Sequence, residues 1–490
     1  MFQKIKSWLL ENRNFRQTIM KNAFWLTVSN VLGRVIKAVL IIFAARILGV
    51  ASYGIFSYAL SLAAFFTIFV DIGLGPILTR ETAKKDLPKE YFSTTLTIKF
   101  ALVTFSVLLI IFVAPFFAKI PEAINLLPIV ALLIFFDSLR DFSYSLTRAW
   151  EKMEWEALIS IFTNVAITVL GILILLLWPT NKNLVIGYTL GSALGLMASI
   201  FVLRRRFLQS FKFIFNKNLA KKIFQEAWPF ALLGFLGGIM INTDTLMLGW
   251  MKTASDLGYY AAAQRPVQFL YLIPAIIATA VFPTFSRLAG KDNNKFRSLL
   301  EKSIRSSLLF AIPITLGGLI LAPQIISLLF GNSYLPATTA FIFLLLTILL
   351  TFPGTLIGNA IFAHNKQQQF IGYLALGALG NVVFNAVLIP PFGISGAAFA
   401  TILAQTLAIG FNWKNMKKIN NFQTLKYLPR IVLAGLLMTG LVFILKIWGV
   451  NIIINILIAA PFYFLCLYWL KEPLFALFNF PAIIKKLIVK

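Results

Sequence analysis

The sequence is short of the residue types from which most metal and redox sites are built. Its 490 residues include one cysteine, Cys466, and one histidine, His364. A single cysteine excludes an intramolecular disulfide framework, and the two residues together cannot form a zinc site or a cysteine–histidine dyad. We therefore expect neither a metal centre nor a cofactor.

Charged residues are also scarce. They make up 12% of the chain, whereas soluble domains carry about 25%. Hydrophobic residues make up 59% and the mean hydropathy is +0.86, which predicts an all-α integral membrane protein. The 17 acidic residues are far outnumbered by 44 basic ones, for a net charge of +27. Because the basic residues lie in short segments between apolar runs, they indicate membrane topology rather than a nucleic-acid partner.

Apolar runs long enough to cross a bilayer recur along the whole chain. We predict about fourteen membrane-spanning helices, at 23–47, 55–79, 93–117, 123–146, 157–179, 184–203, 226–250, 262–286, 304–329, 336–363, 369–390, 394–413, 429–448 and 450–470. The connections are short and leave no room for a separate soluble domain.

The basic residues are concentrated in every second connection between the predicted spans, which predicts a membrane topology. With the N-terminus inside, the outer segments hold only Arg46, Lys119, Lys182, Lys252 and Lys446. Four more cations fall within spans, and the remaining ones lie in inner segments. Positive charge concentrates on the cytoplasmic side of membrane proteins, so we expect both termini in the cytoplasm and the chain in the plasma (inner) membrane.

A weak internal repeat divides the chain. The corner GVASYG at 49–54, after the first span, has a counterpart in ASDLGYYAA at 254–262, and Asn164-Val165 pairs with Asn381-Val382. Chance similarity is the alternative. The repeat predicts two six-helix lobes related by an axis along the membrane normal. We expect the lobes at 1–203 and 226–413, a basic cytoplasmic linker at 204–225, and two additional spans with a basic tail at 414–490.

Several motifs resemble one known family. They are NAFW (22–25), AARILG (44–49), YG (53–54), DIGL (71–74), TRE (79–81), NVVFN (381–385), LIP (388–390) and GISGAA (393–398). The chain resembles polysaccharide-biosynthesis flippases, which are the O-antigen and lipid-linked-oligosaccharide translocases of the multidrug/oligosaccharidyl-lipid/polysaccharide exporter superfamily. The resemblance implies export of an undecaprenyl-diphosphate-linked glycan by alternating access, from the inner to the outer leaflet. In the related lipid II flippases, cavity arginines sit in the first and eighth helices, and Arg34 and Arg265 match those places.

Cations within spans are the candidate ligands of such an anionic headgroup. Charge at membrane depth is costly and normally faces a water-filled cavity or a partner. Arg34 and Lys37 are three residues apart, on one helical face. The predicted substrate-binding residues are Arg34, Lys37, Lys99, Arg265, Gln264 and Gln268. Gln264 and Gln268 could bond sugar hydroxyls, whereas Lys99 could simply reach the inner headgroups.

Acidic and amide residues in spans are candidates for coupling to Na⁺ or H⁺, or for gating. They are Asp71, Asp137, Arg140, Asp141, Asn242 and Asp244. Structural alternatives stay open for each: Asp71 could pair with Arg34 or Lys37, and Asp244 with Arg265. The Asp137–Arg140–Asp141 group could be an internal ion-pair cluster.

Two other functions compete with the flippase. A cation-coupled multidrug exporter of the same superfamily would need an acidic cavity, whereas cations predominate here. A membrane glycosyltransferase or polymerase would need carboxylates and a sizeable outer loop, so we expect no enzyme.

Overall fold

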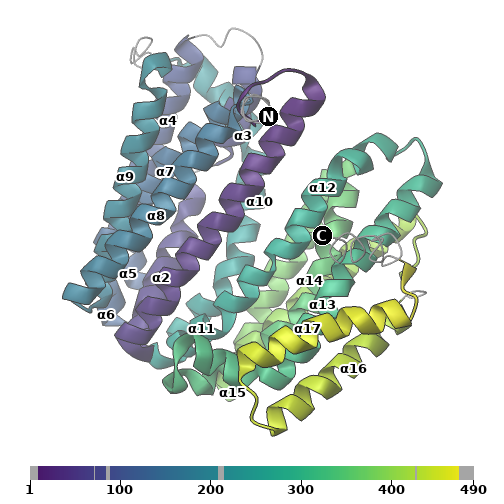
Figure 1. The fold of residues 1–490 in the computed structure, drawn as a ribbon. Coiled ribbons are helices and arrows are strands. Elements are labelled where there is room, and N and C mark those ends of the chain that lie inside the picture. Colours follow the sequence, from purple (N-terminus) through teal and green to yellow (C-terminus); the bar gives the residue numbers. More distant parts are fainter. Residues whose placement is uncertain (1–8, 71, 84–88, 208–214, 425–427, 474–490) are drawn as a thin grey trace, which may run out of the picture. The chain divides into compact units, whose positions relative to one another are not determined.

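Figure 1 presents the computed structural model of the chain, which describes residues 9–70, 72–83, 89–207, 215–424 and 428–473. Within these ranges the regular structure is entirely helical, with no strand. Local glycine and proline residues, together with polar capping side chains, decide where the long helices bend and begin.

The first two predicted spans form one kinked helix, α2 (Phe15–Phe66). The side chain of Asn14 caps its start by accepting a hydrogen bond from the backbone N–H of Gln17. Its bend lies at Gly49, whose φ of +73° is costly for residues with a Cβ atom. The predicted corner is therefore present, but only as a sharp bend within α2. A short 3₁₀ turn, η1 (Thr67–Phe69), and helix α3 (Leu74–Ala83) follow.

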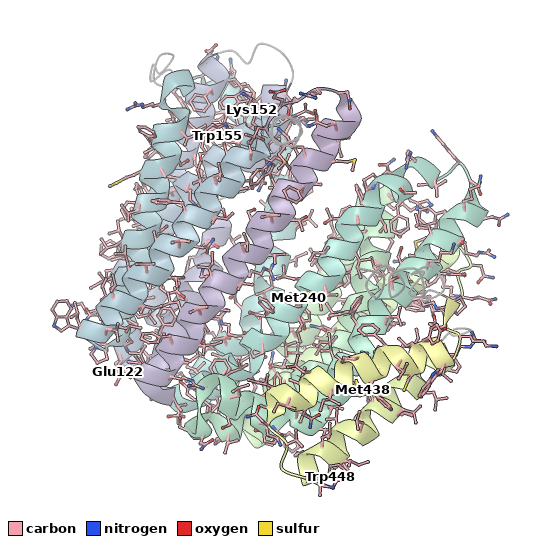
Figure 2. All side chains as sticks on the ribbon, in the orientation of Figure 1. Glu122, Lys152, Trp155, Met240, Met438 and Trp448 are labelled. Atoms are coloured by element: carbon pink, nitrogen blue, oxygen red, sulfur yellow. The ribbon has the colours of Figure 1, made fainter. Side chains whose placement is uncertain are left out.

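The next helices run up and down beside α2. They are α4 (Lys89–Leu108), the π-helical turn η2 (Leu109–Val113), α5 (Ala114–Phe117), α6 (Pro121–Ile124), α7 (Leu127–Ala149), α8 (Met153–Leu177), α9 (Asn181–Phe207) and α10 (Lys217–Met251). Figure 2 shows Lys152 and Trp155 at one end of this bundle and Glu122 at the other. Helices α7 and α8 therefore run its full length.

The second half repeats the pattern of long helices. It contains α11 (Ala254–Leu270), α12 (Leu272–Leu288), α13 (Asn293–Phe330), the 3₁₀ turn η4 (Asn332–Ala337), α14 (Thr338–Ala363), α15 (Gln367–Ile419), α16 (Leu428–Ile447) and α17 (Ile452–Trp469). Helix α15 bends at Gly393, where φ is +55°. Trp448 marks the tight turn between α16 and α17 (Figure 2).

Eleven helical segments among the described residues are long and apolar enough to cross a membrane. Two of them contain the bends at Gly49 and Gly393 and therefore count as two spans each. Helix α7 is long enough but carries four charged residues, so it is not among the eleven. Counting it as well gives fourteen, which confirms the predicted all-α membrane architecture.

The chain divides into two compact units, Met1–Ala261 and Ala262–Lys490. This boundary falls within α11, downstream of the basic segment 204–225 at which we expected the lobes to divide. Pro266 lies four residues after Ala262 and lacks the N–H that would bond to the Ala262 carbonyl group. The helix is therefore weakened at the unit boundary, and the division into six-helix lobes stays a prediction.

The two corners of the sequence repeat touch each other inside the first unit. A methyl group at Gly54 would overlap the carbonyl oxygen of Ala254, and one at Gly258 would overlap the carbonyl oxygen of Val50. Gly54 and Gly258 occupy equivalent places in the repeat, and so do Val50 and Ala254. The same contact between a glycine and a carbonyl group is therefore made twice, once by each corner. Only glycine allows backbones to approach this closely.

The last two helices are fixed to α13 by polar contacts. Pro313 removes the helical hydrogen bond of the Leu309 carbonyl group, and the Tyr463 hydroxyl of α17 donates to that oxygen at 3.0 Å. Arg305 of α13 forms a buried ion pair with Glu472, just after α17. These contacts and an apolar cluster hold α16 and α17 against α13 within the second unit.

Candidate functional site

Helix α2 packs on α8 along a face of small and apolar residues. A Cβ atom at Gly33 would lie 2.8 Å from Nδ2 of Asn164, so the helices are in close contact there. One turn on, the Thr168 hydroxyl donates to the carbonyl oxygen of Ile36 at 3.2 Å. Leu40 is fully buried and faces Gly171. This contact fixes the rotation of α2 and therefore which side chains it presents elsewhere.

Three polar side chains line a neighbouring strip of α2. Asn30, Arg34 and Lys37 follow one another at intervals of four and three residues, so they share one helical face. Asn30 and Arg34 are exposed, and Lys37 is partly buried with its Nζ 5.3 Å from the ring centre of Tyr188 on α9. We call these three residues the α2 polar stripe. The sequence predicted its two cations; Asn30 was missed, although its spacing of four from Arg34 could have indicated it.

Lys99 of α4 is buried rather than directed to a membrane surface. It is 2% exposed, and its Nζ donates to the carbonyl oxygen of Val70 at 3.1 Å and lies 6.0 Å from the ring centre of Phe142. Ser106, also on α4, donates to the carbonyl oxygen of Phe66 at 2.8 Å. Both acceptors belong to the end of α2 and the turn after it, where helical carbonyl groups lose their own partners. Asp71, which comes next, lies outside the described residues.

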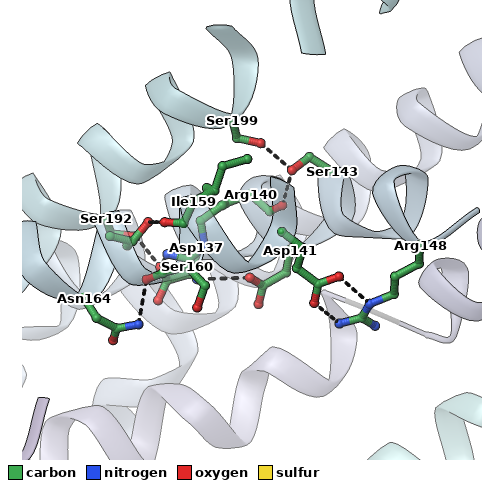
Figure 3. A network of polar contacts seen from close by, with 12 residues as sticks. Asp137, Arg140, Asp141, Ser143, Arg148, Ile159, Ser160, Asn164, Ser192 and Ser199 are labelled. Atoms are coloured by element: carbon green, nitrogen blue, oxygen red, sulfur yellow. Dashed lines mark hydrogen bonds and ion pairs between the residues drawn. The ribbon is translucent and has the colours of Figure 1, made fainter. Parts of the chain in front are cut away.

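The charges of α7 form one network (Figure 3). Arg140 pairs with Asp137 at 2.7 Å and with Asp141 at 3.0 Å. The Ser192 hydroxyl of α9 donates to Asp137, and Ser143 of α7 is hydrogen-bonded to Ser199 of α9. The sequence predicted the grouping of the three charged residues. The serines of α9 could not be found from the sequence, because they come from a different helix.

Asn242 and Asp244 make different contacts. The Asn242 amide donates back to the carbonyl oxygen of Gly238 at 3.0 Å, within α10. Asp244 is buried, and the Tyr260 hydroxyl of α11 donates to its Oδ2 at 2.7 Å. This contact links α10 to α11 next to the crossing of Gly54 and Gly258.

In the second unit, the candidate residues lie on α11. A guanidinium nitrogen of Arg265 donates to Oε1 of Gln268 at 3.4 Å, and both residues, like Gln264, are partly buried. The Nε of Arg265 is buried without a hydrogen-bond partner among the described residues. Buried donors without a partner are costly, so this guanidinium group is suited to receive an oxygen ligand.

No group of three or more metal-ligating side chains occurs in the part of the chain that the structure describes. The candidate residues are instead cations, amides and carboxylates within long helices. Cations and amides of this kind can bind anions and hydroxyl groups.

The comparisons define the family. A family model described as polysaccharide biosynthesis protein matches residues 19–289, and the model described as MatE matches residues 229–388. The first match covers more than half of the chain, so the protein belongs to the polysaccharide biosynthesis protein family. This confirms the resemblance found in the sequence motifs.

Named relatives cover most of the chain. A probable low-salt glycan biosynthesis flippase of Haloferax volcanii is 23% identical over 453 residues, 91% of this chain and 93% of the relative. The capsular polysaccharide biosynthesis protein CapF of Staphylococcus aureus is 23% identical over 402 residues, 80% of this chain and 97% of the relative.

Solved structures share the fold. The lipid II flippase MurJ, in an inward closed conformation, matches with a TM-score of 0.76 and 19% identity over 91% of this chain and 99% of that one. The MATE transporter VcmN of Vibrio cholerae matches with a TM-score of 0.60 and 14% identity over 82% and 96%. The protein is therefore a multi-pass membrane protein with a transporter fold, and its named relatives include flippases.

Proposed function

We propose that this protein is a flippase for a polyprenyl-diphosphate-linked oligosaccharide, a precursor of cell-surface polysaccharide. It moves the lipid from the inner to the outer leaflet of the plasma membrane by alternating access, with both termini in the cytoplasm. The observation that carries the proposal is the α2 polar stripe, which places Arg34 and Lys37 on one face of a membrane-spanning helix. The names of the relatives support the same substrate class.

The chemistry of the stripe suits a diphosphate. An arginine guanidinium group binds phosphate oxygens in a bidentate manner and stays charged at every relevant pH. Lysine adds a point charge one turn away. At membrane depth such contacts are stronger than in water, and the polyprenyl tail can remain among the acyl chains.

The second unit contributes a matching set of donors. Arg265 has a guanidinium nitrogen available for an oxygen ligand, and Gln264 and Gln268 provide amides one turn apart. We assign these residues to the phosphate and sugar part of the substrate. Lys99 already holds the carbonyl group of Val70, so we assign it to stabilising the end of α2.

Coupling to Na⁺ or H⁺ is part of the proposal. Asp137 and Asp141 of α7 and Asp244 of α10 each contact polar partners. Arg140 and Asn242 are their polar neighbours in the same helices, and Asp71 belongs to this set by its position in the sequence. If these residues instead open and close the transport path, the gate consists of the same side chains.

A multidrug exporter is the second candidate, because the fold is shared with MATE transporters. Export of cationic drugs would require a cavity of negative charge. The excess of cations over acids within the spans disfavours it. The protein is expected to translocate its substrate without changing it chemically.

Transport in proteoliposomes tests the proposal. The probe is a fluorescent polyprenyl-diphosphate sugar whose transfer between leaflets is measured by quenching. We expect Arg34→Ala and Arg265→Ala to abolish transfer at an unchanged protein level. Cys466→Ala is the control and should transport normally, since Cys466 is buried among apolar residues of the second unit. Normal transport by both arginine variants would contradict the proposal.

A further inference from the structure

Arg140 of α7 has two carboxylate partners that differ in how firmly they are held (Figure 3). The Asp137 carboxylate lies 2.7 Å from the guanidinium group, and it also accepts a hydrogen bond from the Ser192 hydroxyl of α9. The Asp141 carboxylate lies 3.0 Å from the guanidinium group and has no other hydrogen-bond partner among the described residues. Its side chain is 60% exposed, against 37% for Asp137. Asp137 therefore fixes the arginine, whereas Asp141 can leave it at little cost, because an exposed ion pair is weak.

The guanidinium group of Arg140 still has donors to offer. It carries five N–H donors, and the hydrogen bonds to Asp137 and Asp141 use one nitrogen each. Its Nε is buried without a hydrogen-bond partner in the described part of the chain. The group can therefore bind further oxygen atoms beside Asp137 once Asp141 moves away.

We propose that Asp141 is an internal substitute for a phosphate group of the substrate. In the empty protein its carboxylate neutralises Arg140, and when the lipid binds, a phosphate oxygen takes its place on the guanidinium group. Carboxylate and phosphate suit the same donors, because each presents oxygen atoms that match the nitrogens of a guanidinium group. Arg140 is then a further phosphate ligand and Asp141 its counter-ion. The inference rests on the proposed function, since it adds a residue to its substrate site.

The transport cycle gives a reason for such a counter-ion. A protein that works by alternating access passes through part of its cycle without substrate. Arg140 lies nine residues before the end of α7 at Ala149, about 14 Å along the helix. An unpaired cation at that depth is costly. Asp141 supplies the negative charge while the protein is empty, and this role requires no ion gradient.

The neighbouring pair of Arg148 and Glu156 has the properties of a permanent contact. Two guanidinium nitrogens of Arg148 donate to the two carboxylate oxygens of Glu156 at 2.9 and 2.6 Å, and the Glu156 side chain is only 7% exposed. Breaking this pair would leave a buried carboxylate without its counter-ion, which is strongly unfavourable. Asp141 instead makes one contact from an exposed position, so it is the carboxylate of α7 that can be exchanged.

Binding of farnesyl diphosphate to the purified full chain in detergent tests the inference. We expect Asp141→Asn to bind the probe about tenfold more tightly than the wild type, because the carboxylate no longer occupies the guanidinium group or repels the phosphate. Arg140→Gln should weaken binding about tenfold. In the Arg140→Gln background, Asp141→Asn should change the affinity about twofold or less, since Asp141 acts through Arg140.

Transport in proteoliposomes separates a counter-ion from a charge that only repels the substrate. With the fluorescent polyprenyl-diphosphate sugar, Asp141→Asn should lower the substrate concentration at half-maximal rate. It should also lower the maximal rate several-fold, because the empty protein now has to return with Arg140 less well neutralised.

Asp292→Asn is the matched control. Asp292 forms an ion pair with Lys295 and caps the start of α13, and asparagine is an equally good N-cap. Its affinity and maximal rate should equal those of the wild type. If Arg140→Gln does not fold because Asp137 has lost its counter-ion, Arg140→Gln/Asp137→Asn takes its place as the background.

Three results would overturn the inference alone, with Arg34→Ala still weakening binding. Asp141→Asn binds no more tightly than the wild type, its maximal rate is not reduced, or its gain in affinity persists in full without Arg140. A wild-type protein that neither binds farnesyl diphosphate nor transfers the lipid would overturn the proposed function, and the inference with it.

Discussion

Lys21, near the start of α2, shows how a single buried charge is compensated. It is fully buried, and its Nζ lies 2.8 Å from the Glu154 carboxylate of α8, 2.6 Å from Oδ1 of Asn12 and 3.3 Å from the carbonyl oxygen of Glu151. All three donors of the ammonium group are therefore used. The contacts fasten the start of α2 to the turn before α8.

Removing one partner of this pair should be costly. We predict that Glu154→Gln destabilises the protein by about 3–5 kcal/mol, because it leaves the Lys21 charge buried without a counter-ion. Thermal unfolding in detergent micelles measures the change. The matched double variant Lys21→Met/Glu154→Gln removes the charge as well and should recover part of the loss. A single variant as stable as the wild type would show that the pair is not buried as described.

Residues differ in how much of their role the sequence reveals. Arg34 and Lys37 stand out because they interrupt an apolar run, and their common face follows from helical spacing. Tyr188 could not be predicted as their neighbour, since one tyrosine among many aromatic residues carries no local signal. Lys99 also interrupts an apolar run, but it lies nearer the end of its predicted span than Lys37 does. Its contact with the carbonyl oxygen of Val70 could not be predicted, because that residue comes from another segment of the chain.

At the scale of elements, the crossing of α2 and α11 depends on two glycines. We predict that Gly54→Ala or Gly258→Ala disrupts this contact at a cost of about 1–3 kcal/mol or more, since the new methyl group meets backbone atoms that cannot rotate away. The disrupted contact should lower the melting temperature of each variant and reduce its transport in proteoliposomes.

Gly440→Ala is the matched control for this pair. Gly440 lies within α16 and has open space around its Cβ position. Alanine should leave stability equal or slightly higher there, because it favours helix more than glycine does. The interpretation of the crossing would fail if all three variants melted at the same temperature.

The sequence predicted which segments are helical, but it did not predict where several helices begin. Helix α10 begins at Lys217, before the predicted start at 226, and α13 begins at Asn293, before the predicted start at 304. Hydropathy detects only the part of a helix that crosses the apolar layer. The polar turns before it are instead defined by caps, such as Asn216 and Asp292.

At the scale of the whole molecule, the distribution of basic residues predicts the orientation. The single cysteine makes the test simple, because a Cys466→Ala background has no thiol. A new cysteine at Lys182, an exposed residue at the start of α9, should react with an impermeant maleimide added to intact cells. One at Lys291, between α12 and α13, should react only after lysis. The reverse pattern would contradict the predicted topology.

The apolar runs predicted the number of spans correctly. The alternation of basic segments supported that number, because an error in the count would have reversed all later segments. The boundary between the compact units could not be predicted as well from the sequence. The sequence marks the basic segment 204–225, whereas the units meet at Ala261 and Ala262. Contacts such as that between Gly54 and Gly258 join α11 to the first unit, and such packing leaves only a weak trace in the sequence.

We propose that the cations in the spans select an anionic lipid headgroup. The most direct measurement compares three probes in the same proteoliposomes: a polyprenyl-diphosphate sugar, the neutral polyprenyl alcohol carrying the same sugar, and a cationic dye. We expect transfer of the diphosphate alone, and loss of this transfer in Arg34→Ala. Accumulation of the dye, or equal transfer of the neutral lipid, would contradict it.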